Sequence, residues 1–304
     1  MKKNGVKLGR QKKYDFIFTI FHPFHLVPKA AVSCGKELDI PVIIKVDDAI
    51  YQKATGLKNL QRKIEKAYNS RTLQQGDKIL VPNQYTKELV HDYYRVDSNK
   101  ISIIPNGTEL DNFLKSNLDS KQIIFSGAMY HHRGIDVLLD AVPNVIEKIP
   151  KSRFLLLGDG PEMSGLKETV EKNNLAQNVI FKGWIDRNEI PLHLSESAIG
   201  LGPLRLTSVT KYALPIKVLE YMASSLPILA VKGTLPEQVL KDGENGFLID
   251  DSNDLAGKIV QLLENDDLRM RMGQKSREMA TKFDWKDIAM SITKEFQDIS
   301  SLSR

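Results

Sequence analysis

Short apolar runs of strand length alternate with longer amphipathic runs along most of this chain. In the first half these runs are DFIFTIF, VIIKV, DKILVP and ISIIP, and stretches of helical period separate them. The alternation resumes in the second half with QIIFSG, FLLLG, NVIF, AIGLGPL and LPILAV. Regular alternation of this kind predicts parallel sheets covered by helices. We therefore expect an α/β fold.

Length and one polar segment divide this alternation into two halves. The 304 residues are more than one typical domain contains and suit two. The segment TELDNFLKSNLDS, at roughly 108–120, has no periodic apolar face and is the best candidate for a linker. We expect a first domain over 1–110 and a second over 111–284, with a helix over 285–304.

Composition favours a cytoplasmic protein. The 43 Lys and Arg residues against 38 Asp and Glu give a net charge of +5, which permits weak attraction to anionic surfaces and does not indicate nucleic acid. Cys34 is the only cysteine, so an internal disulfide and a multi-cysteine metal site are excluded. The basic opening lacks the apolar core of a signal peptide, and no apolar run approaches the roughly 18 residues of a membrane span.

The turns that follow the strands of the second half are candidate binding sites, because ligands of open parallel sheets bind beyond the carboxyl ends of the strands. GAMYHHRG supplies Gly127, Arg133 and Gly134 just before an expected helix. Amides at a helix start together with a guanidinium suit a pyrophosphate. A loop with a surface arginine explains this turn equally well.

Two further turns carry weaker signals. In KGWID, Gly183 lets the backbone approach a flat ligand, and Trp184 or Ile185 can face a base ring. LGDGPE, with Gly158 and Gly160, is more simply explained as a structural turn.

The stretch LPIKVLEYMASSLPIL predicts a short helix that starts near Pro215. The helical period places Lys217, Glu220 and Tyr221 together on a polar face, opposite an apolar face that packs. Lys217 and the first amides favour phosphate, and Glu220 can accept two ribose hydroxyls. In isolation, a plain Lys–Glu pair on the helix surface is the simpler interpretation.

Six stretches taken in order resemble the motifs of the retaining glycosyltransferases of family 4, the glycosyl transferases group 1. This resemblance implies GT-B architecture, with two Rossmann-like domains. The C-terminal domain then binds a nucleotide-sugar, the N-terminal domain holds the acceptor, and the last helix crosses back to the first domain. The stretches run from about 101 to 250 and are IIPNGTELDNF, GAMYHHRGIDVLLDAV, LLLGDGPEMSGL, NVIFKGWI, LPIKVLEYMASSLPILA and EQVLKDGENGFLID.

The resemblance also implies roles for single residues. Glu220 would grip the ribose, Arg133 and Lys217 would contact the diphosphate, and the loop over 183–185 would line the base. Placed cations and helix amides stabilise a leaving diphosphate without a metal, so we expect neither a metal nor a cofactor beyond the donor. The catalytic candidates are Arg133, Lys217, Glu220 and Asp47, and the donor-binding candidates are Gly127, Ala128, Gly134, Gly183, Trp184, Ile185, Pro215 and Ile216.

Three positions depart from the family's pattern. Tyr212 stands where many members have a second glutamate, eight residues before the ribose glutamate. Ala128 stands where many have an arginine after the first glycine of the phosphate loop, and Asp47 stands at the end of a strand that frequently closes with a histidine near the sugar. These differences bear on recognition of the sugar hydroxyls and on one phosphate contact.

The first half begins at a strand that the family reaches only after two or so βα units. The resemblance therefore implies a truncated N-terminal domain whose sheet has an open edge, and such an edge favours pairing with a partner chain. His22 and His25 follow the first strand. With no acid or cysteine near them in sequence, a sugar contact or a surface position is favoured over a metal site.

Basic residues surround an apolar stripe in the helix expected over 57–75. Such a helix can lie on an anionic membrane while the cleft receives a lipid-linked acceptor. A solvated helix whose stripe packs on the sheet is the interpretation we prefer. The basic residues are Lys58, Arg62, Lys63, Lys66 and Arg71, and the stripe is Leu57, Leu60, Ile64 and Ala67.

We expect a metal-independent hexosyltransferase that moves a sugar with retention from a UDP- or GDP-sugar to a glycan, a lipid or a small acceptor, in polysaccharide or glycolipid biosynthesis. The alternative is a noncatalytic subunit that binds nucleotide-sugars and needs a partner chain to complete its first domain. A sugar-nucleotide epimerase is a weaker third hypothesis, because the motif order is that of the transferases.

Overall fold

We describe the protein from a computed structural model, over residues 1–22, 26–47, 57–117 and 119–302. The chain forms two compact units. Unit 1 comprises Met1–Asn106 and Lys286–Arg304, and unit 2 comprises Gly107–Trp285. Each unit has a parallel sheet of its own, so the predicted α/β fold with two Rossmann-like halves is confirmed.

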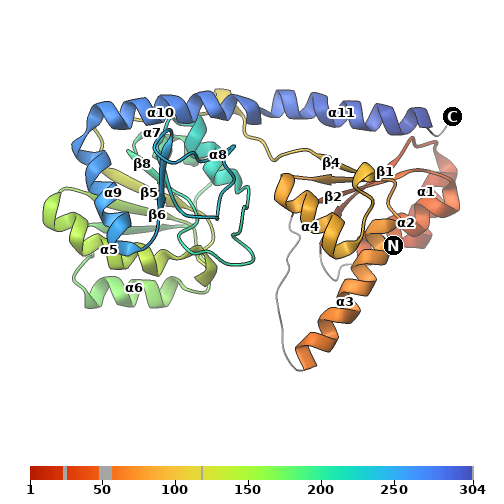
Figure 1. Ribbon diagram of the computed structural model, residues 1–304, viewed down its shortest axis with the longest axis horizontal. Coiled ribbons are helices and arrows are strands. Elements are labelled where there is room, and N and C mark those ends of the chain that lie inside the picture. The colour runs from red at the N-terminus through yellow and green to blue at the C-terminus, as the bar shows by residue number, and fades with distance from the viewer. Residues whose placement is uncertain (23–25, 48–56, 118, 303–304) are drawn as a thin grey trace. The chain divides into compact units, whose positions relative to one another are not determined.

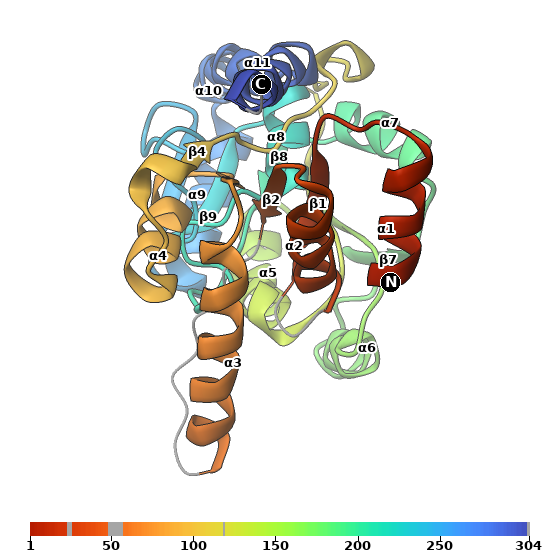
Figure 2. The ribbon, with the colours of Figure 1, turned by 90° about the vertical axis from the view of Figure 1, so that its right-hand side faces the viewer.

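Unit 1 is built on four parallel strands among the described residues. The strands are β1 (Ile17–Phe21), β2 (Val42–Val46), β3 (Lys78–Val81) and β4 (Ile101–Ile103), and the helices are α1 (Lys2–Gln11), α2 (Leu26–Leu38), α3 (Leu57–Gln74), α4 (Gln84–Tyr94), η1 (Ser98–Lys100) and α11 (Trp285–Leu302). The strand order is β1-β2-β3-β4, with Ile17 opposite Val42. The views in Figures 1 and 2 agree that α1 and α2 lie beside β1.

The C-terminal helix α11 contacts the sheet of unit 1 through side chains. The ring of Phe296 lies 4.4 Å from that of Phe16, between centroids. Glu295 forms an ion pair with Lys78 at 3.0 Å. These contacts explain why the last part of the chain belongs to the same unit as the first part.

Unit 2 holds a six-stranded parallel sheet in the order β10-β9-β8-β5-β6-β7. Its strands are β5 (Gln122–Ser126), β6 (Arg153–Leu157), β7 (Val179–Gly183), β8 (Ile199–Leu201), β9 (Ile228–Val231) and β10 (Gly246–Ile249). Its helices are α5 (Ile135–Lys148), α6 (Met163–Lys172), α7 (Ile190–Ser195), α8 (Ile216–Ala223), α9 (Ser252–Glu264) and α10 (Asp266–Ala280), with the short helices η2 (Leu110–Asn112), η3 (His131–Arg133), η4 (Arg187–Glu189) and η5 (Thr281–Phe283).

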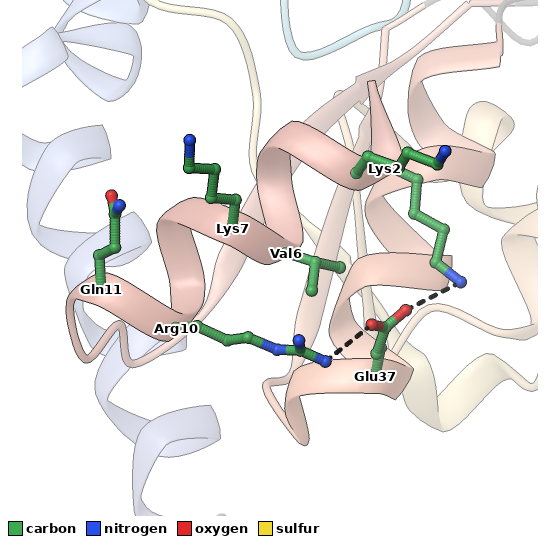
Figure 3. A pocket seen from close by; sticks show the side chains of 7 residues that line it. Lys2, Val6, Lys7, Arg10, Gln11 and Glu37 are labelled. Carbon is green, nitrogen blue, oxygen red and sulfur yellow. Dashed lines mark hydrogen bonds and ion pairs between the residues drawn. The ribbon is translucent and has the colours of Figure 1, made fainter.

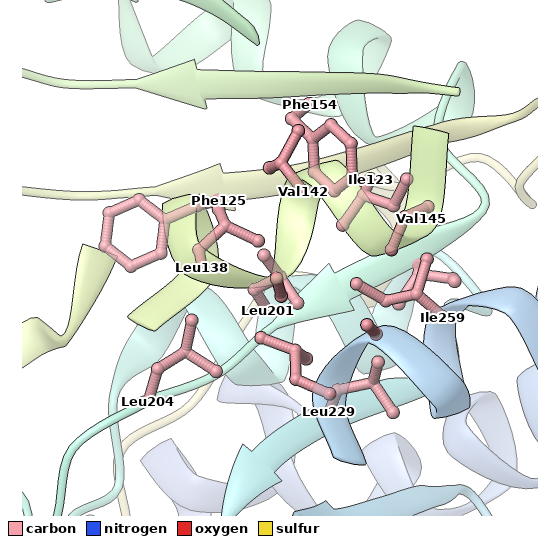
Figure 4. Packing of buried hydrophobic residues seen from close by; sticks show 14 of the residues in the cluster. Ile123, Phe125, Leu138, Val142, Val145, Phe154, Leu201, Leu204, Leu229 and Ile259 are labelled. Carbon is pink, nitrogen blue, oxygen red and sulfur yellow. The ribbon is translucent and has the colours of Figure 1, made fainter. Parts of the chain in front are cut away.

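Two apolar clusters cover the two faces of this sheet. Ile123 and Phe125 of β5 face one cluster with α5, α6 and α9, whereas Ile124 faces the other with α7 and α8. This split follows from the period of two along a strand. Figure 4 shows Phe125 and Leu138 packed in the first cluster.

The strand order reverses at β5, and this reversal decides where a ligand can bind. From β5 the chain continues outward to β6 and β7, and it then crosses to β8 on the other side of β5. The neighbouring connections therefore leave the sheet in opposite directions, and ligands of open parallel sheets bind at the carboxyl ends of the strands at such a reversal. The turn after β5 begins with Gly127, a predicted site residue.

The apolar stripe of α3 differs from our preferred expectation. Leu60 is 59% exposed and Ile64 is 65% exposed, so this part of the stripe does not pack on the sheet of unit 1. The expectation was wrong because helical period shows which residues share a face but not whether another element covers that face.

Across the described ranges, the helices are all too short or too polar to traverse a bilayer.

Candidate functional site

Two glycine turns meet at the carboxyl end of the sheet of unit 2. Gly127 and Gly158 follow β5 and β6 with φ angles of +133° and +119°, a region that side chains other than glycine rarely adopt. A Cβ on Gly158 would overlap the carbonyl oxygen of Gly127. The turn after β6 is structural, as predicted, and it supports the turn after β5.

The loop after β5 carries a group of basic side chains. Arg133 is half-buried at the end of η3, and Gly134 follows it at a φ of +75°. A Cβ on Gly134 would lie 2.7 Å from the backbone of Leu204, so this position requires glycine. The ring of His132 stacks on Tyr130 at 5.5 Å between centroids. Burial lowers the pKa of His132, and the nearby positive charge of Arg133 lowers it further.

The ammonium group of Lys217 is buried beside the Gly127 turn. The Nζ atom lies 3.5 Å from the centroid of the Phe125 ring and has no hydrogen-bond partner among the described residues. A Cβ built on Gly127 would stand 3.6 Å from it. Burial lowers the pKa of Lys217 well below its usual value, the charge of Arg133 lowers it too, and Glu220 opposes both effects. An unpaired cation excluded from water is unfavourable unless an anion binds there.

Glu220, one turn further along α8, is buried and lines a polar cavity of about 340 Å³. Burial raises the pKa of its carboxyl, whereas the charges of Arg187 and Lys217 lower it. The structure thus couples Lys217 electrostatically to both Arg133 and Glu220. The residues that line the cavity with Glu220 are Glu109, Asn112, Phe113, Arg187, Asn188 and Pro191.

Arg187 was not predicted as a site residue. It begins η4, capped by Asp186, whose side chain accepts a hydrogen bond from the Asn188 amide. It lies two residues beyond the predicted base loop, and that short distance was the only signal in the sequence that could have found it.

Tyr221 corrects one sequence prediction. The helical period placed it on the polar, ligand-facing side of the helix with Lys217 and Glu220, but its side chain is fully buried. Its hydroxyl accepts a hydrogen bond from the Ser126 amide at 2.7 Å. Every residue of α8 from Val218 to Ala223 is buried, so a polar group on this part of the helix must be hydrogen-bonded within the protein.

The predicted base loop follows β7. Gly183 has a φ of +74°, and its carbonyl accepts a hydrogen bond from the Gly158 amide at 2.7 Å. Trp184 is 78% exposed, whereas Ile185 packs against the apolar cluster that contains α8. Of these two side chains, Trp184 is therefore the one accessible to a ligand.

The remaining predicted residues take less buried positions. Ala128 and Ile216 are exposed and Pro215, which caps α8, is half-buried. Tyr212 adopts a φ of +48°, and its amide donates to the carbonyl of Gly233 at 2.9 Å.

Asp47 lies in unit 1 at the end of β2. Its carboxyl forms an ion pair with Lys45 at 3.1 Å, and Lys45 also donates a hydrogen bond to Asn106. His22 is exposed, and His25 lies outside the described residues. In the described ranges, no three His, Cys, Asp or Glu side chains gather as a metal site would require.

A second hollow, of about 630 Å³, lies on α1 in unit 1 and is lined mostly by lysine and arginine side chains (Figure 3). Glu37 forms ion pairs there with Lys2 at 3.0 Å and with Arg10 at 3.2 Å. Both cations are exposed, so these pairs contribute little to stability. The hollow holds no buried unpaired charge comparable to Lys217.

Comparison with known proteins covers both units. A family model described as Glycosyl transferases group 1 matches residues 107–279, and one described as Glycosyltransferase Family 4 matches residues 5–112.

Individual relatives extend this match. An uncharacterized glycosyltransferase of Methanocaldococcus jannaschii is 27% identical over 98% of this chain and 80% of its own length. The alpha-monoglucosyldiacylglycerol synthase of Streptococcus pneumoniae is 25% identical over 85% of this chain and 61% of its own, so the chain spans less than two thirds of that relative. HepE of Anabaena, solved in complex with UDP, shares the fold with a TM-score of 0.81, at 16% identity over 98% of this chain and 82% of that one.

Proposed function

Because this chain belongs to the glycosyl transferases group 1 family, we propose that it transfers a sugar, with retention, from a nucleotide-sugar to an acceptor hydroxyl. The donor is a UDP- or GDP-sugar, and the acceptor is a glycan, a lipid or a small molecule. Donor binding belongs to unit 2, where the predicted phosphate and ribose residues converge.

One observation carries this proposal: the buried, unpaired ammonium of Lys217 beside the Gly127 turn. A diphosphate placed there would supply the missing counter-charge. Arg133 would provide a second cation, because its charge already acts on Lys217. Backbone amides at the glycine turn and at the start of α5 would add further donors to the phosphate oxygens.

Glu220 is proposed to accept hydrogen bonds from the ribose hydroxyls of the donor. Its carboxyl lines the polar cavity and lies one helical turn from Lys217, so a nucleotide whose diphosphate contacts Lys217 would extend its ribose along α8 towards this carboxyl. Arg187 faces the same cavity, and its charge favours the ionised carboxylate that accepts both hydroxyls. The loop over 183–185 would then line the base of the nucleotide.

The proposed reaction breaks the bond between the anomeric carbon and the diphosphate oxygen. The acceptor oxygen bonds to the anomeric carbon on the same face, and the acceptor proton passes to the departing diphosphate oxygen. Arg133 and Lys217 stabilise the negative charge that develops on this leaving group, the contribution that a metal ion makes in other transferases. We therefore propose a metal-independent reaction, with Asp47 as a candidate partner of a sugar hydroxyl.

A lipid-linked acceptor, with peripheral binding to an anionic membrane, is supported by the exposed stripe of α3. Leu60 and Ile64 are exposed there beside Arg62 and Lys63. The pneumococcal relative is, by its name, a glycolipid synthase. Flotation with vesicles that contain acidic phospholipid tests this acceptor class: salt-sensitive binding supports it, and its absence removes it.

The proposed function is tested first by thermal shift with UDP-, GDP- and ADP-sugars, because a ligand that binds only the folded protein raises its melting temperature. The donor that shifts the wild type is then assayed for hydrolysis and transfer. Glu220→Ala should lose both the shift and the turnover. Glu168→Ala, at an exposed position of α6, is the matched control and should retain both.

Turnover that survives Glu220→Ala unchanged would defeat the assignment of this carboxylate. Binding of the donor without turnover in the wild-type protein, in the presence of acceptor mixtures, would instead favour the noncatalytic alternative.

A further inference from the structure

Tyr221 occupies the space between helix α8 and the central strands of unit 2. Its ring is fully buried and lies against Gly200 of β8, where an added Cβ would stand 2.7 Å from two ring carbons. The strand thus carries glycine at the one point where the ring crosses it. This arrangement fixes the ring in a single position.

The hydroxyl of Tyr221 accepts a hydrogen bond from a backbone amide of β5 that does not bond to a neighbouring strand. β5 pairs with β8 only at Ile123 and Ile124. The Gly127 amide donates to Leu157 of β6 at 2.9 Å, so the preceding amide, on Ser126, points to the opposite side. There Ser126 donates to the Tyr221 hydroxyl at 2.7 Å instead of to a strand carbonyl.

This hydrogen bond acts on the residue that immediately precedes the Gly127 turn. The same helix carries Lys217, whose ammonium faces that turn, and Glu220, which lines the polar cavity. Movement of β5 relative to α8 would therefore change the distance between the turn's amides and the Lys217 ammonium. Tyr221 is the side chain that ties the two elements together at this point.

We propose that Tyr221 is a positioning residue of the donor site: its hydroxyl holds the Gly127 turn at the distance from Lys217 that a diphosphate requires. The inference rests on the proposed function, because it assigns the diphosphate of a sugar nucleotide to this turn. Tyr221 does not touch the donor. Burial raises the pKa of its phenol, so the hydroxyl remains neutral at any working pH.

Tyr221→Phe removes the hydroxyl and keeps the ring. The matched control is Tyr94→Phe, at a buried tyrosine of unit 1. Calorimetric titration with inorganic pyrophosphate and with UDP gives the affinity of the folded protein. We expect both dissociation constants to rise about fivefold to tenfold in Tyr221→Phe, the effect of one lost hydrogen bond, and to stay unchanged in Tyr94→Phe.

Steady-state kinetics provides a readout that a purely structural role would not move. The turn holds the diphosphate both before and during bond breaking, so the donor KM should rise by the same factor while kcat changes less than twofold. A lower melting temperature with wild-type dissociation constants and KM would mean that the hydroxyl only stabilises the fold, and this would overturn the inference.

Gly200→Ala keeps the hydroxyl and tests the inference if Tyr221→Phe does not fold. Its methyl group would displace the ring, and pyrophosphate affinity should fall in the same direction. Wild-type pyrophosphate affinity in folded Gly200→Ala would overturn the inference. If both single variants fold, their losses should not add in the double variant, because both act through one contact. Additive losses would overturn the inference.

Failure of the inference and failure of the proposed function have different signatures. A wild-type protein that binds neither pyrophosphate nor any nucleoside diphosphate would overturn the proposed function and this inference with it. A wild-type protein that binds them, beside a folded Tyr221→Phe variant that binds equally tightly, would overturn the inference alone.

Discussion

The Lys217 side chain ends where water does not reach, so its charged form opposes folding, and under the proposed function a bound anion would offset this cost. Its ammonium faces the Phe125 ring and the Gly127 turn instead of a carboxylate. Because burial and Arg133 lower its pKa, the folded protein binds fewer protons here than the unfolded chain does. Stability therefore rises with pH from the lowered pKa towards the usual value of 10.5.

Replacing Lys217 with methionine should separate these two effects. Without ligand, the variant should be more stable than the wild type by roughly 0.5–2 kcal/mol near neutral pH, since an apolar side chain suits the buried position. Its stability should no longer rise as the pH approaches the usual lysine value of 10.5, and pyrophosphate should no longer raise its melting temperature. Lys167→Met, at an exposed position of α6, is the control in scanning calorimetry. A variant that still binds pyrophosphate would contradict the role of Lys217.

Glu220→Gln should distinguish ribose recognition from phosphate recognition. Losing a hydrogen bond to a charged group weakens binding by about 1.5–3 kcal/mol, so the UDP dissociation constant should rise about tenfold or more. Pyrophosphate has no ribose, and its affinity should fall no further than twofold. Isothermal titration with both ligands checks this difference, and an equal loss for both would place Glu220 at the phosphates.

The same variant has a pH signature of opposite sign to that of Lys217. Because burial raises the pKa of Glu220, the folded protein holds this proton more tightly than the unfolded chain does. Stability from this group is present below the usual value of 4.5 and is lost as the pH rises through the raised pKa. Glu220→Gln should therefore flatten the decline of stability over that interval, as measured by denaturant titration at several pH values.

At single positions, the sequence identified a candidate site residue where a suitable side chain also stood at a suitable spacing within a motif. Spacing placed Lys217 and Glu220 on one face of a helix, and the family resemblance marked them as site residues. In the structure Lys217 lies beside the Gly127 turn and Glu220 lines a polar cavity. Tyr221 shares that spacing and was predicted wrongly, because helical period gives an angle around the helix axis and not the elements that cover it. Arg187 lies outside every motif and is brought to Glu220 only by the packing of η4.

Among the elements, the pair of turns after β5 and β6 depends on close backbone contact. Gly158 has the positive φ and lacks the side chain that would collide with the Gly127 carbonyl. Its amide also bonds to Gly183 of the base loop at 2.7 Å. Three turns that follow three adjacent strands are therefore held together at a single glycine.

Gly158→Ala should displace the Gly127 turn. We expect a loss of roughly 1–3 kcal/mol in the free energy of unfolding, from strain at a positive φ. Pyrophosphate binding should weaken at least fivefold, as measured by titration of the folded variant. The control is Gly165→Ala on α6, where an added Cβ meets nothing within 4 Å and should be neutral or stabilising. Wild-type affinity in Gly158→Ala would show that the close approach of these turns is not required.

The elements themselves were largely predictable, whereas their neighbours were not. Periodicity located every strand of unit 1 among the described residues and five of the six strands of unit 2, because a buried strand needs a run of apolar residues. It missed β10, whose four residues follow a glycine-rich turn. It gave no pairing partner for β5, which lies beside β8 although more than 70 residues separate their sequences. β8 is also shorter than its apolar run and ends at Leu201. The Gly202 amide still donates to the carbonyl of Leu229 in β9, but Pro203 has no amide that could continue the ladder.

For the molecule as a whole, each unit has its own apolar core. The core of unit 1 is centred on β2 and β3, with Ile44 and Ile79, and the two clusters of unit 2 enclose β5. The polar segment around 108–120 suggested a division of the chain, because no periodic apolar face continues through it. Helical period predicted a helix at the C-terminus, and only the family resemblance indicated which unit that helix joins. The long-range contacts of Phe296 and Glu295 that hold it there have no local signal.

Separate cores, together with the proposed nucleotide site in unit 2, lead to a prediction about unfolding. Differential scanning calorimetry of the full chain should resolve two transitions, and UDP should raise only the transition of unit 2. At a hundred times its dissociation constant, a ligand stabilises the unit that binds it by about 2.7 kcal/mol. Tyr94→Phe should lower only the other transition and so assigns it to unit 1, and Lys217→Met should remove the response to UDP. A single transition that UDP shifts as a whole would mean that the two cores unfold together, and the energetic independence inferred from their packing would then be wrong.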